Sequence, residues 1–130
     1  MSSFTNALET DVLTHFFTTS TAPTRPTTWY LSLHTADPGE TGSAAAEVDG
    51  NAYARVAVTF TVVGNNASNN AAVEFAAASP LTWGVITHVG IMTAETSGTM
   101  IAYGALASSR TVAAGDVLRV QTGDLDVNMS

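Results

Sequence analysis

Residues 53–63 read YARVAVTFTVV and show the clearest strand pattern of this 130-residue chain. From Val56 to Val62, a large apolar side chain stands at every second position, with small or polar side chains between them. Successive side chains of a β-strand point to opposite faces, so this alternation predicts a strand over 53–63 with one buried face. The segment therefore indicates a sheet that packs one of its faces on a core.

Other stretches on both sides of this segment show a similar strand pattern. Residues 29–34 place three large apolar side chains on one face. Further strands are predicted, in chain order, around 73–75 and at 85–93, 99–105, 110–113, 116–122 and 124–129.

Turn-forming residues separate these strands. Asp37, Pro38 and Gly39 open a predicted loop that runs to about residue 51, and the Gly- and Asn-rich stretch 64–70 predicts another loop. Many short strands at close spacing favour an antiparallel β-sandwich or a jelly roll. Parallel βαβ architecture is excluded, because no second helical segment separates the strands.

The first seventeen residues follow a helical period instead. A wide apolar stripe recurs at spacings of three to four residues and is formed by Phe4, Leu8, Val12, Leu13, Phe16 and Phe17. Ser2 or Ser3 is available as the N-cap, and the β-branched, proline-bearing stretch 18–23 ends the predicted helix. We therefore expect a single domain over 1–130, mainly β, with an N-terminal amphipathic α-helix within 1–18 and a β-sandwich over 28–130.

The charge of the chain excludes several classes of partner. Eleven carboxylates oppose four arginines, lysine is absent, and the formal net charge is -7. Such a chain neutralises few phosphates, so we expect no binding to nucleic acid or to an anionic membrane. The chain has no cysteine, which excludes disulfides, thiolate metal sites and thiol nucleophiles. Neither a signal peptide nor a membrane-spanning apolar run is visible, so we expect a soluble protein made in a cytoplasm.

No motif in the sequence indicates catalysis or a cofactor. His15, His34 and His88 lack the paired spacing of a zinc site, and hydrogen-bonding histidines are the simpler interpretation. The chain has neither a Gly-rich phosphate loop nor a Gly-x-Ser-x-Gly elbow. We therefore predict that the protein is not an enzyme and that it has no cofactor, metal or catalytic residues.

Two carboxylate groupings leave a calcium site open as an alternative. Asp124 and Asp126 share one strand face, and Glu47 and Asp49 lie in the loop that precedes Asn51. Oxygen ligands of this kind bind calcium, but the loop lacks the spacing of an EF-hand. A carboxylate pair such as Asp124 and Asp126 can also catalyse glycoside hydrolysis. A terminal strand with alternating Asp and apolar residues is usually solvated on one face and buried on the other, which is the favoured interpretation.

The order of several motifs resembles a family of small tailed-bacteriophage virion proteins, often labelled phage tail fibre protein, some of which act as capsid decoration or cement proteins. The resemblance covers almost the whole chain and is sharpest at WGVITHVGI over 83–91. The remaining pieces are the helical stretch 4–17, WYLSLHTADPG over 29–39, YAR at 53–55, YGAL at 103–106, AGD at 114–116 and GDL at 123–125.

This resemblance implies a structural protein on the outer surface of the phage virion, made in the host cytoplasm. The first expectation is a capsid decoration (cement) protein that binds the major capsid protein and clamps adjacent capsomers. The alternative is a tail fibre or tail-tip module that contacts tail proteins and binds host surface glycans. Symmetric self-association is expected in either case, and a trimer fits the three-fold positions of a capsid.

The helix stripe and one aromatic residue are the predicted interface. The stripe spans more than half of the helix circumference, whereas packing on one sheet needs little more than about 100°. We therefore expect one side of the helix to face the sandwich and the other to face a neighbouring subunit or capsid protein. Trp83, which follows Pro80 and Leu81, is expected as an aromatic on a loop. The predicted interface residues are Phe4, Leu8, Val12, Phe16, Phe17 and Trp83.

Overall fold

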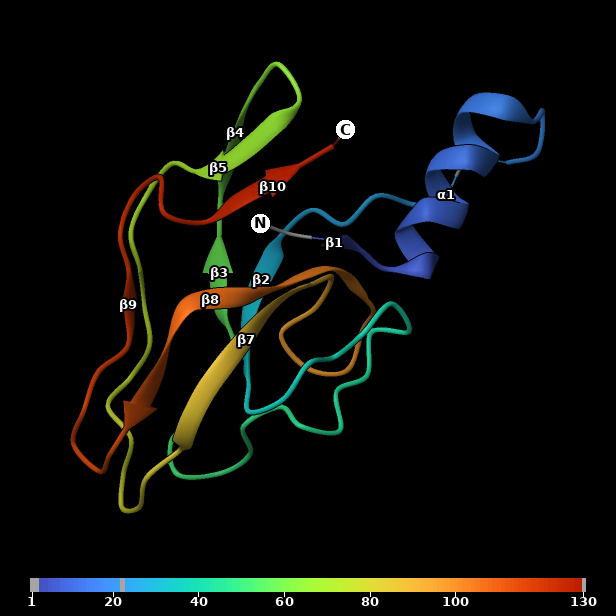
Figure 1. The fold of residues 1–130 in the computed structure, drawn as a ribbon. Helices are drawn as coiled ribbons and strands as arrows, with labels where there is room; N and C mark the ends of the chain where they lie inside the picture. Colours follow the sequence, from blue (N-terminus) through green and yellow to red (C-terminus); the bar gives the residue numbers. More distant parts are fainter. Residues whose placement is uncertain (1–2, 22, 130) are drawn as a thin grey trace.

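The computed structural model describes residues 3–21 and 23–129 and is built mainly from antiparallel strands (Figure 1). A five-stranded sheet has the order β1 (Ser3–Phe4), β8 (Met100–Val112), β7 (Gly84–Met92), β2 (Trp29–His34), β3 (Val56–Val58). A three-stranded sheet has the order β10 (Asp126–Asn128), β5 (Asn66–Asn69), β4 (Phe60–Val63). Two further strands, β6 (Val73–Glu74) and β9 (Arg119–Val120), pair with each other.

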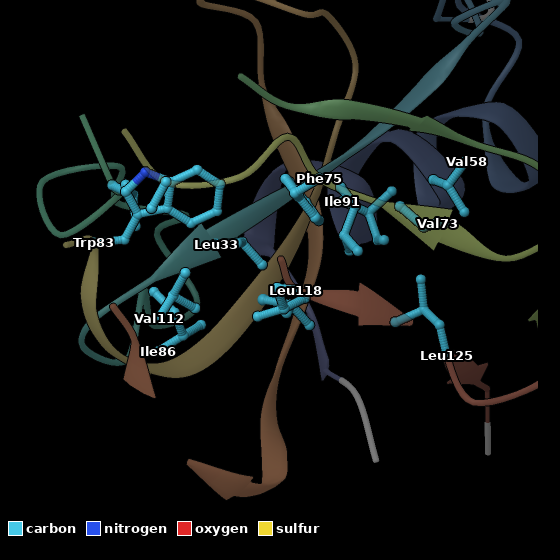
Figure 2. Close-up of a cluster of buried hydrophobic side chains, with 14 of the residues drawn as sticks. Leu33, Val58, Val73, Phe75, Trp83, Ile86, Ile91, Val112, Leu118 and Leu125 are labelled. Carbon is cyan, nitrogen blue, oxygen red and sulfur yellow. The ribbon is translucent and has the colours of Figure 1, made fainter. Parts of the chain in front are cut away.

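One hydrophobic core joins these sheets (Figure 2). Leu31 and Leu33 of β2 are fully buried, and they lie in the same cluster as Phe75, Leu118 and Leu125, which come from or beside the smaller sheets. Apolar side chains of the five-stranded sheet and of the smaller sheets therefore remove one another from water, which is the main favourable contribution to folding. The predicted fold class, mainly β and antiparallel with one N-terminal helix, is confirmed, and the arrangement is sandwich-like.

The strand predicted over 53–63 divides between two sheets. β3 pairs with β2 in the five-stranded sheet, whereas β4 pairs with β5 in the three-stranded sheet. The chain changes sheet at Thr59, so the alternation does not continue on one buried face. Val58 is 2% exposed, but Val62 is 69% exposed. The prediction of one continuous strand with one buried face is wrong, because pairing partners and not periodicity decide where a strand ends.

The loop predicted at 64–70 is a hairpin. Val63 pairs with Asn66, which leaves a two-residue turn, and Gly64 has a φ of +61° as its first residue. A positive φ at the first central residue but not at the second, Asn65, indicates a type II′ turn, which matches the twist of the flanking strands. β5 has no large apolar residue, and the buried Asn69 fixes it by accepting hydrogen bonds from the backbone N–H groups of Gly123 and Leu125.

The predictions for the C-terminal half hold in part. β7 and the closing strand lie where the pattern places them, but the separate strands at 99–105 and 110–113 are one long strand, β8. β8 follows β7 along its whole length and absorbs register shifts at Ile86/His88 and at Ile91/Met92. The strand expected at 116–122 is reduced to the two residues of β9.

The N-terminal helix α1 (Asn6–Phe17) begins later than predicted. Thr5 is its N-cap, and the Thr5 side chain accepts a hydrogen bond from the backbone N–H of Leu8. Ser3 lies in β1, and Ser2 lies outside the described residues. Phe4 therefore belongs to a strand that pairs with β8 and is not the first residue of the helical stripe. The helix lies at one side of the β-sheets and contacts them through β8 and β1 (Figure 1).

Candidate functional site

The helix α1 carries large apolar side chains that the rest of the chain does not cover. None of its twelve residues is buried. Leu8 and Val12 are half-buried, but Leu13 is 58%, Phe16 is 72% and Phe17 is 79% exposed. We call Leu13, Phe16 and Phe17 the apolar tip. An exposed apolar patch with polar surroundings is typical of a protein–protein interaction site.

A hollow of about 400 Å³ lies beside the apolar tip. It separates α1 from the first and last strands of the described chain. We call it the α1 hollow. Its walls are formed by Ser3, Phe4, Glu9, Val12, Leu13, Asn128 and Met129. Leu13 belongs to both features, so the tip and the hollow are continuous along the helix. Among the predicted interface residues, Phe4 and Val12 thus line the hollow, Phe16 and Phe17 belong to the apolar tip, and Leu8 is half-buried and lines neither.

The start of α1 is anchored firmly to the sheet. The buried Thr5 donates a hydrogen bond from Oγ1 to the carbonyl oxygen of Met100 at 2.7 Å, and its backbone N–H donates to the carbonyl of Ile101 at 3.0 Å. The backbone N–H of Asn6 donates to the carbonyl of Glu40 at 2.9 Å. The first turn is therefore held in place, and it presents the exposed last turn at a defined position.

Trp83 is not the exposed aromatic that the sequence predicts. It lies on a loop, but it is only 6% exposed, and its indole N–H donates to the carbonyl oxygen of Asn51 at 2.8 Å. Its ring packs edge-on against Tyr53 at 5.4 Å and against Phe75 at 6.2 Å. The indole fills the core and satisfies its one donor there, so an interface or glycan-stacking role for Trp83 is wrong for this structure.

The three histidines have different surroundings. His15 is exposed on α1 and packs against the ring of Phe16, with 4.6 Å between the ring centroids. His34 is fully buried, and its Nε2 lies 2.8 Å from the Ser32 hydroxyl. Burial lowers the pKa of His34 below its ordinary value. His88 pairs with His34 across β2 and β7. Within residues 3–21 and 23–129, no group of three or more His, Asp or Glu side chains is arranged to hold a metal ion.

Glu47, a residue of the calcium alternative, is part of a buried ion-pair cluster. Arg55 donates to it twice, from Nε and from Nη2, each at 2.8 Å, and the Tyr53 hydroxyl donates at 2.6 Å. The side chains of Arg55 and Glu47 are 8% and 12% exposed. Burial alone would raise the pKa of Glu47, but the hydrogen bonds from Arg55 and Tyr53 outweigh it and lower that pKa. Burial and the bond to Glu47 raise the pKa of Tyr53.

Sequence reasoning missed this cluster. Arg55 appears in the alternation of 53–63 as an outward-facing residue, and no spacing rule pairs it with a carboxylate eight residues earlier. Arg55 also donates from Nη1 to the carbonyls of Ala94 and Ser97. The cluster therefore connects the loop that ends near residue 51 with the turn after β7, and its role is structural.

The second carboxylate grouping lines a separate hollow of about 690 Å³. Asp124 and Asp126 contribute to its wall together with Asp37, His88 and Tyr103. Asp126 accepts hydrogen bonds from the Ser68 hydroxyl and the Asn66 amide. These bonds lower the pKa of Asp126 and hold β10 to β5.

In the part of the chain that the structure describes, no helix is long and apolar enough to cross a membrane. Comparison with protein families gives a match over residues 3–128 to the family described as "Podophage GP4 fiber I protein gp80". None of the curated proteins matches the chain. The family match covers the helix, all of the sheets and every lining residue of both hollows except Met129.

Proposed function

We propose that this chain, which belongs to the family of podophage GP4 fiber I protein gp80, is a structural subunit of a fibre on the outer surface of the virion. The match over residues 3–128 carries the proposal, because it includes nearly every residue of the chain. Proteins of this family have a structural role in the phage virion. The resemblance found in the sequence favours a capsid decoration protein over a tail fibre. We reverse this order because the description of the matched family names a fibre protein.

The structure supports two separate roles within such a subunit: the β-sheets provide the folded core, and α1 provides the attachment surface. The sheets and their core form a stable body, and α1 presents the apolar tip away from that core. A fibre subunit needs both, because it must fold and must then attach to a neighbour. The apolar tip is the attachment surface in this proposal, since burying it against another protein removes apolar area from water.

The charge of the chain suits a position outside the particle. The net charge is -7, and two of the four arginines are bound by carboxylates within the chain: Arg55 by Glu47, and Arg119 by Glu74. Packaged DNA is a dense array of phosphates, and it repels a chain of this charge. A surface that faces solvent carries no such penalty, which favours the outer side of the virion.

A capsid decoration protein is the second candidate, because the same charge and the same apolar tip also suit a subunit that clamps adjacent capsomers. Copy number separates the two functions. A fibre subunit is present in a small number of copies at the tail or its attachment point, whereas a decoration protein covers the capsid in hundreds.

The test is to measure the copy number and to locate the protein on the phage that encodes it. Quantitative mass spectrometry of purified virions, calibrated against the major capsid protein, provides the number of copies. Image reconstruction of the same virions locates the β-sheets and α1. A small number of copies at the tail supports the fibre. Hundreds of copies on the capsid overturn it in favour of decoration, and absence from the virion overturns both.

A further inference from the structure

The apolar tip and the α1 hollow lie on the same side of the same helix. Phe16 and Phe17 project from the last turn, and the hollow lies against Glu9, Val12 and Leu13 about one to two turns earlier. Each molecule thus carries a protrusion and a recess that are close to each other, and both are anchored to the body by the bonds of the first turn.

We infer that the occupant of the α1 hollow is the helix α1 of a second copy of this chain, which runs antiparallel so that each apolar tip enters the other hollow. This inference deepens the proposed function and rests on it, because it names the neighbour to which the attachment surface binds. The contact is isologous: the same patch serves on both molecules, and a two-fold axis lies close to Leu13.

The two-fold arrangement explains why the protrusion and the recess lie on one helix. If residue 17 of one helix lies opposite residue 9 of the other, the mid-point of the contact is residue 13. Both tips are then buried in a single association step, and no exposed apolar end remains for a third copy. A head-to-tail contact would leave one tip and one hollow uncovered at each end of the assembly.

The charges on α1 favour the antiparallel direction over a parallel one. Glu9 lines the hollow and is the carboxylate nearest to the contact. A parallel pair places the two Glu9 side chains at the same level, where they repel each other. An antiparallel pair separates them by about 12 Å along the axis, at about 1.5 Å per residue. It also places the two helix dipoles side by side in opposite directions, so that the positive end of each lies near the negative end of the other, which is the more favourable orientation.

The available area is enough for a weak specific contact. A buried aromatic side chain covers about 150–250 Å², and Phe16 and Phe17 expose 72% and 79% of theirs. Four such rings and the walls that they cover give a buried area on the order of 1,000 Å², the lower end for a specific interface. We therefore expect a dimer that dissociates on dilution.

The first experiment measures the mass of the full chain in solution over a range of concentrations by sedimentation equilibrium. The unaltered chain is expected to shift from monomer to dimer as its concentration rises. The double variant Phe16→Ser and Phe17→Ser is expected to raise the dimer dissociation constant at least tenfold. The matched control is Val62→Ser and Val63→Ser, because these valines of β4 are 69% and 74% exposed on another sheet. A chain that stays monomeric, or a control that weakens the dimer equally, overturns the inference.

The second experiment tests the direction of the two helices by disulfide cross-linking. The chain has no cysteine, so a single introduced cysteine reports one contact. Leu13→Cys lies near the two-fold axis and is expected to form a covalent dimer under mild oxidation. Asn6→Cys lies two turns earlier on the same face, and its two copies are about 21 Å apart along an antiparallel pair. That distance exceeds the roughly 7 Å between Cα atoms that a disulfide spans.

The pattern of cross-links therefore has a defined outcome. A dimer from Leu13→Cys alone supports the antiparallel pair. Cross-linking of both variants identifies a parallel contact and overturns the inference, as does cross-linking of neither. A chain that is monomeric in solution but present in a small number at the phage tail overturns only the α1 pair and leaves the proposed function in place.

Discussion

Two groups of aromatic residues in this molecule have opposite surroundings. Tyr53, Phe75 and Trp83 pack in the core with ring centroids 5.4–6.2 Å apart, and Phe75 is 1% exposed. Phe16 and Phe17 are 72% and 79% exposed on the last turn of α1. The residue types are alike, so the difference comes from the elements that carry them.

The core aromatics are enclosed because several strands and loops converge on them from different parts of the chain. The helix is bonded to the body at its start, through Thr5 and Asn6, whereas Phe16 and Phe17 of its last turn are exposed within the described chain. Hydrophobicity thus marks a residue for burial without specifying which molecule buries it. We therefore expect the first group to contribute to folding and the second to assembly.

The largest expected effect comes from removing a core ring. Phe75→Ala should lower the free energy of unfolding by about 3–5 kcal/mol, because it removes buried apolar surface and leaves a cavity between Tyr53 and Trp83. Urea unfolding followed by circular dichroism measures the change. A loss below about 1 kcal/mol would contradict this prediction, since the core aromatics would then contribute no more to folding than an exposed surface residue.

The next largest effect is expected at the buried ion pair between Glu47 and Arg55. Glu47→Gln should lower the free energy of unfolding by about 2–3 kcal/mol, because it leaves Arg55 buried without its anionic partner. The matched control is Glu74→Gln, whose partner is Arg119 in an exposed pair with side chains 54% and 49% exposed. The control should cost less than about 1 kcal/mol, as exposed ion pairs do. Equal losses in the two variants would contradict the structural role of the Glu47 cluster.

The buried His34 should make the stability of the body depend on pH. Burial keeps the pKa of His34 below its ordinary value of 6.5 in the folded protein. The unfolded chain therefore binds a proton that the folded chain does not, and stability falls as the pH drops below about 6.5. The slope is at most about 1.4 kcal/mol per pH unit for one group.

The measurement is urea unfolding of the unaltered chain and of two variants, His15→Gln and His34→Gln, between pH 7 and pH 5. The unaltered chain and His15→Gln, which changes only an exposed residue of α1, should lose stability over this range. His34→Gln should show a smaller slope. Glu47 contributes in a separate window: its lowered pKa gives stabilisation that is present above its ordinary value of 4.5 and is lost as the pH falls through the folded value. An unchanged slope in His34→Gln would show that another group titrates here.

The smallest effect on folding is expected at the apolar tip. Phe16→Ser and Phe17→Ser should each change the free energy of unfolding of the monomer by no more than about 0.5 kcal/mol, because the folded chain does not bury these rings. The measurement is urea unfolding at a concentration where the unaltered chain is monomeric. A loss comparable to that of Phe75→Ala would mean that the helix is part of the core, and the division between folding and assembly would fail.

Local features of the sequence were enough to place several elements. The strand at 29–34 has the predicted bounds, and the helix ends at Phe17 just before the predicted stop. Turn residues such as Gly64 and Gly123 lie at real chain reversals with positive φ. These features depend on periodicity and on backbone conformations that only a few residues adopt easily, so neighbouring residues suffice to reveal them.

Tertiary structure alone decided which side chains are covered and which strand pairs with which. It divides 53–63 at Thr59, buries Trp83, exposes Val62 and brings Arg55 to Glu47. Each outcome depends on segments that are distant in sequence or on a choice between sheets, and neither leaves a periodic signal. Local sequence patterns were enough to establish a mainly antiparallel β protein with an apolar N-terminal helix. The packing of the sheets decided that the last turn of this helix stays uncovered within one chain, because no other part of the described chain reaches over it.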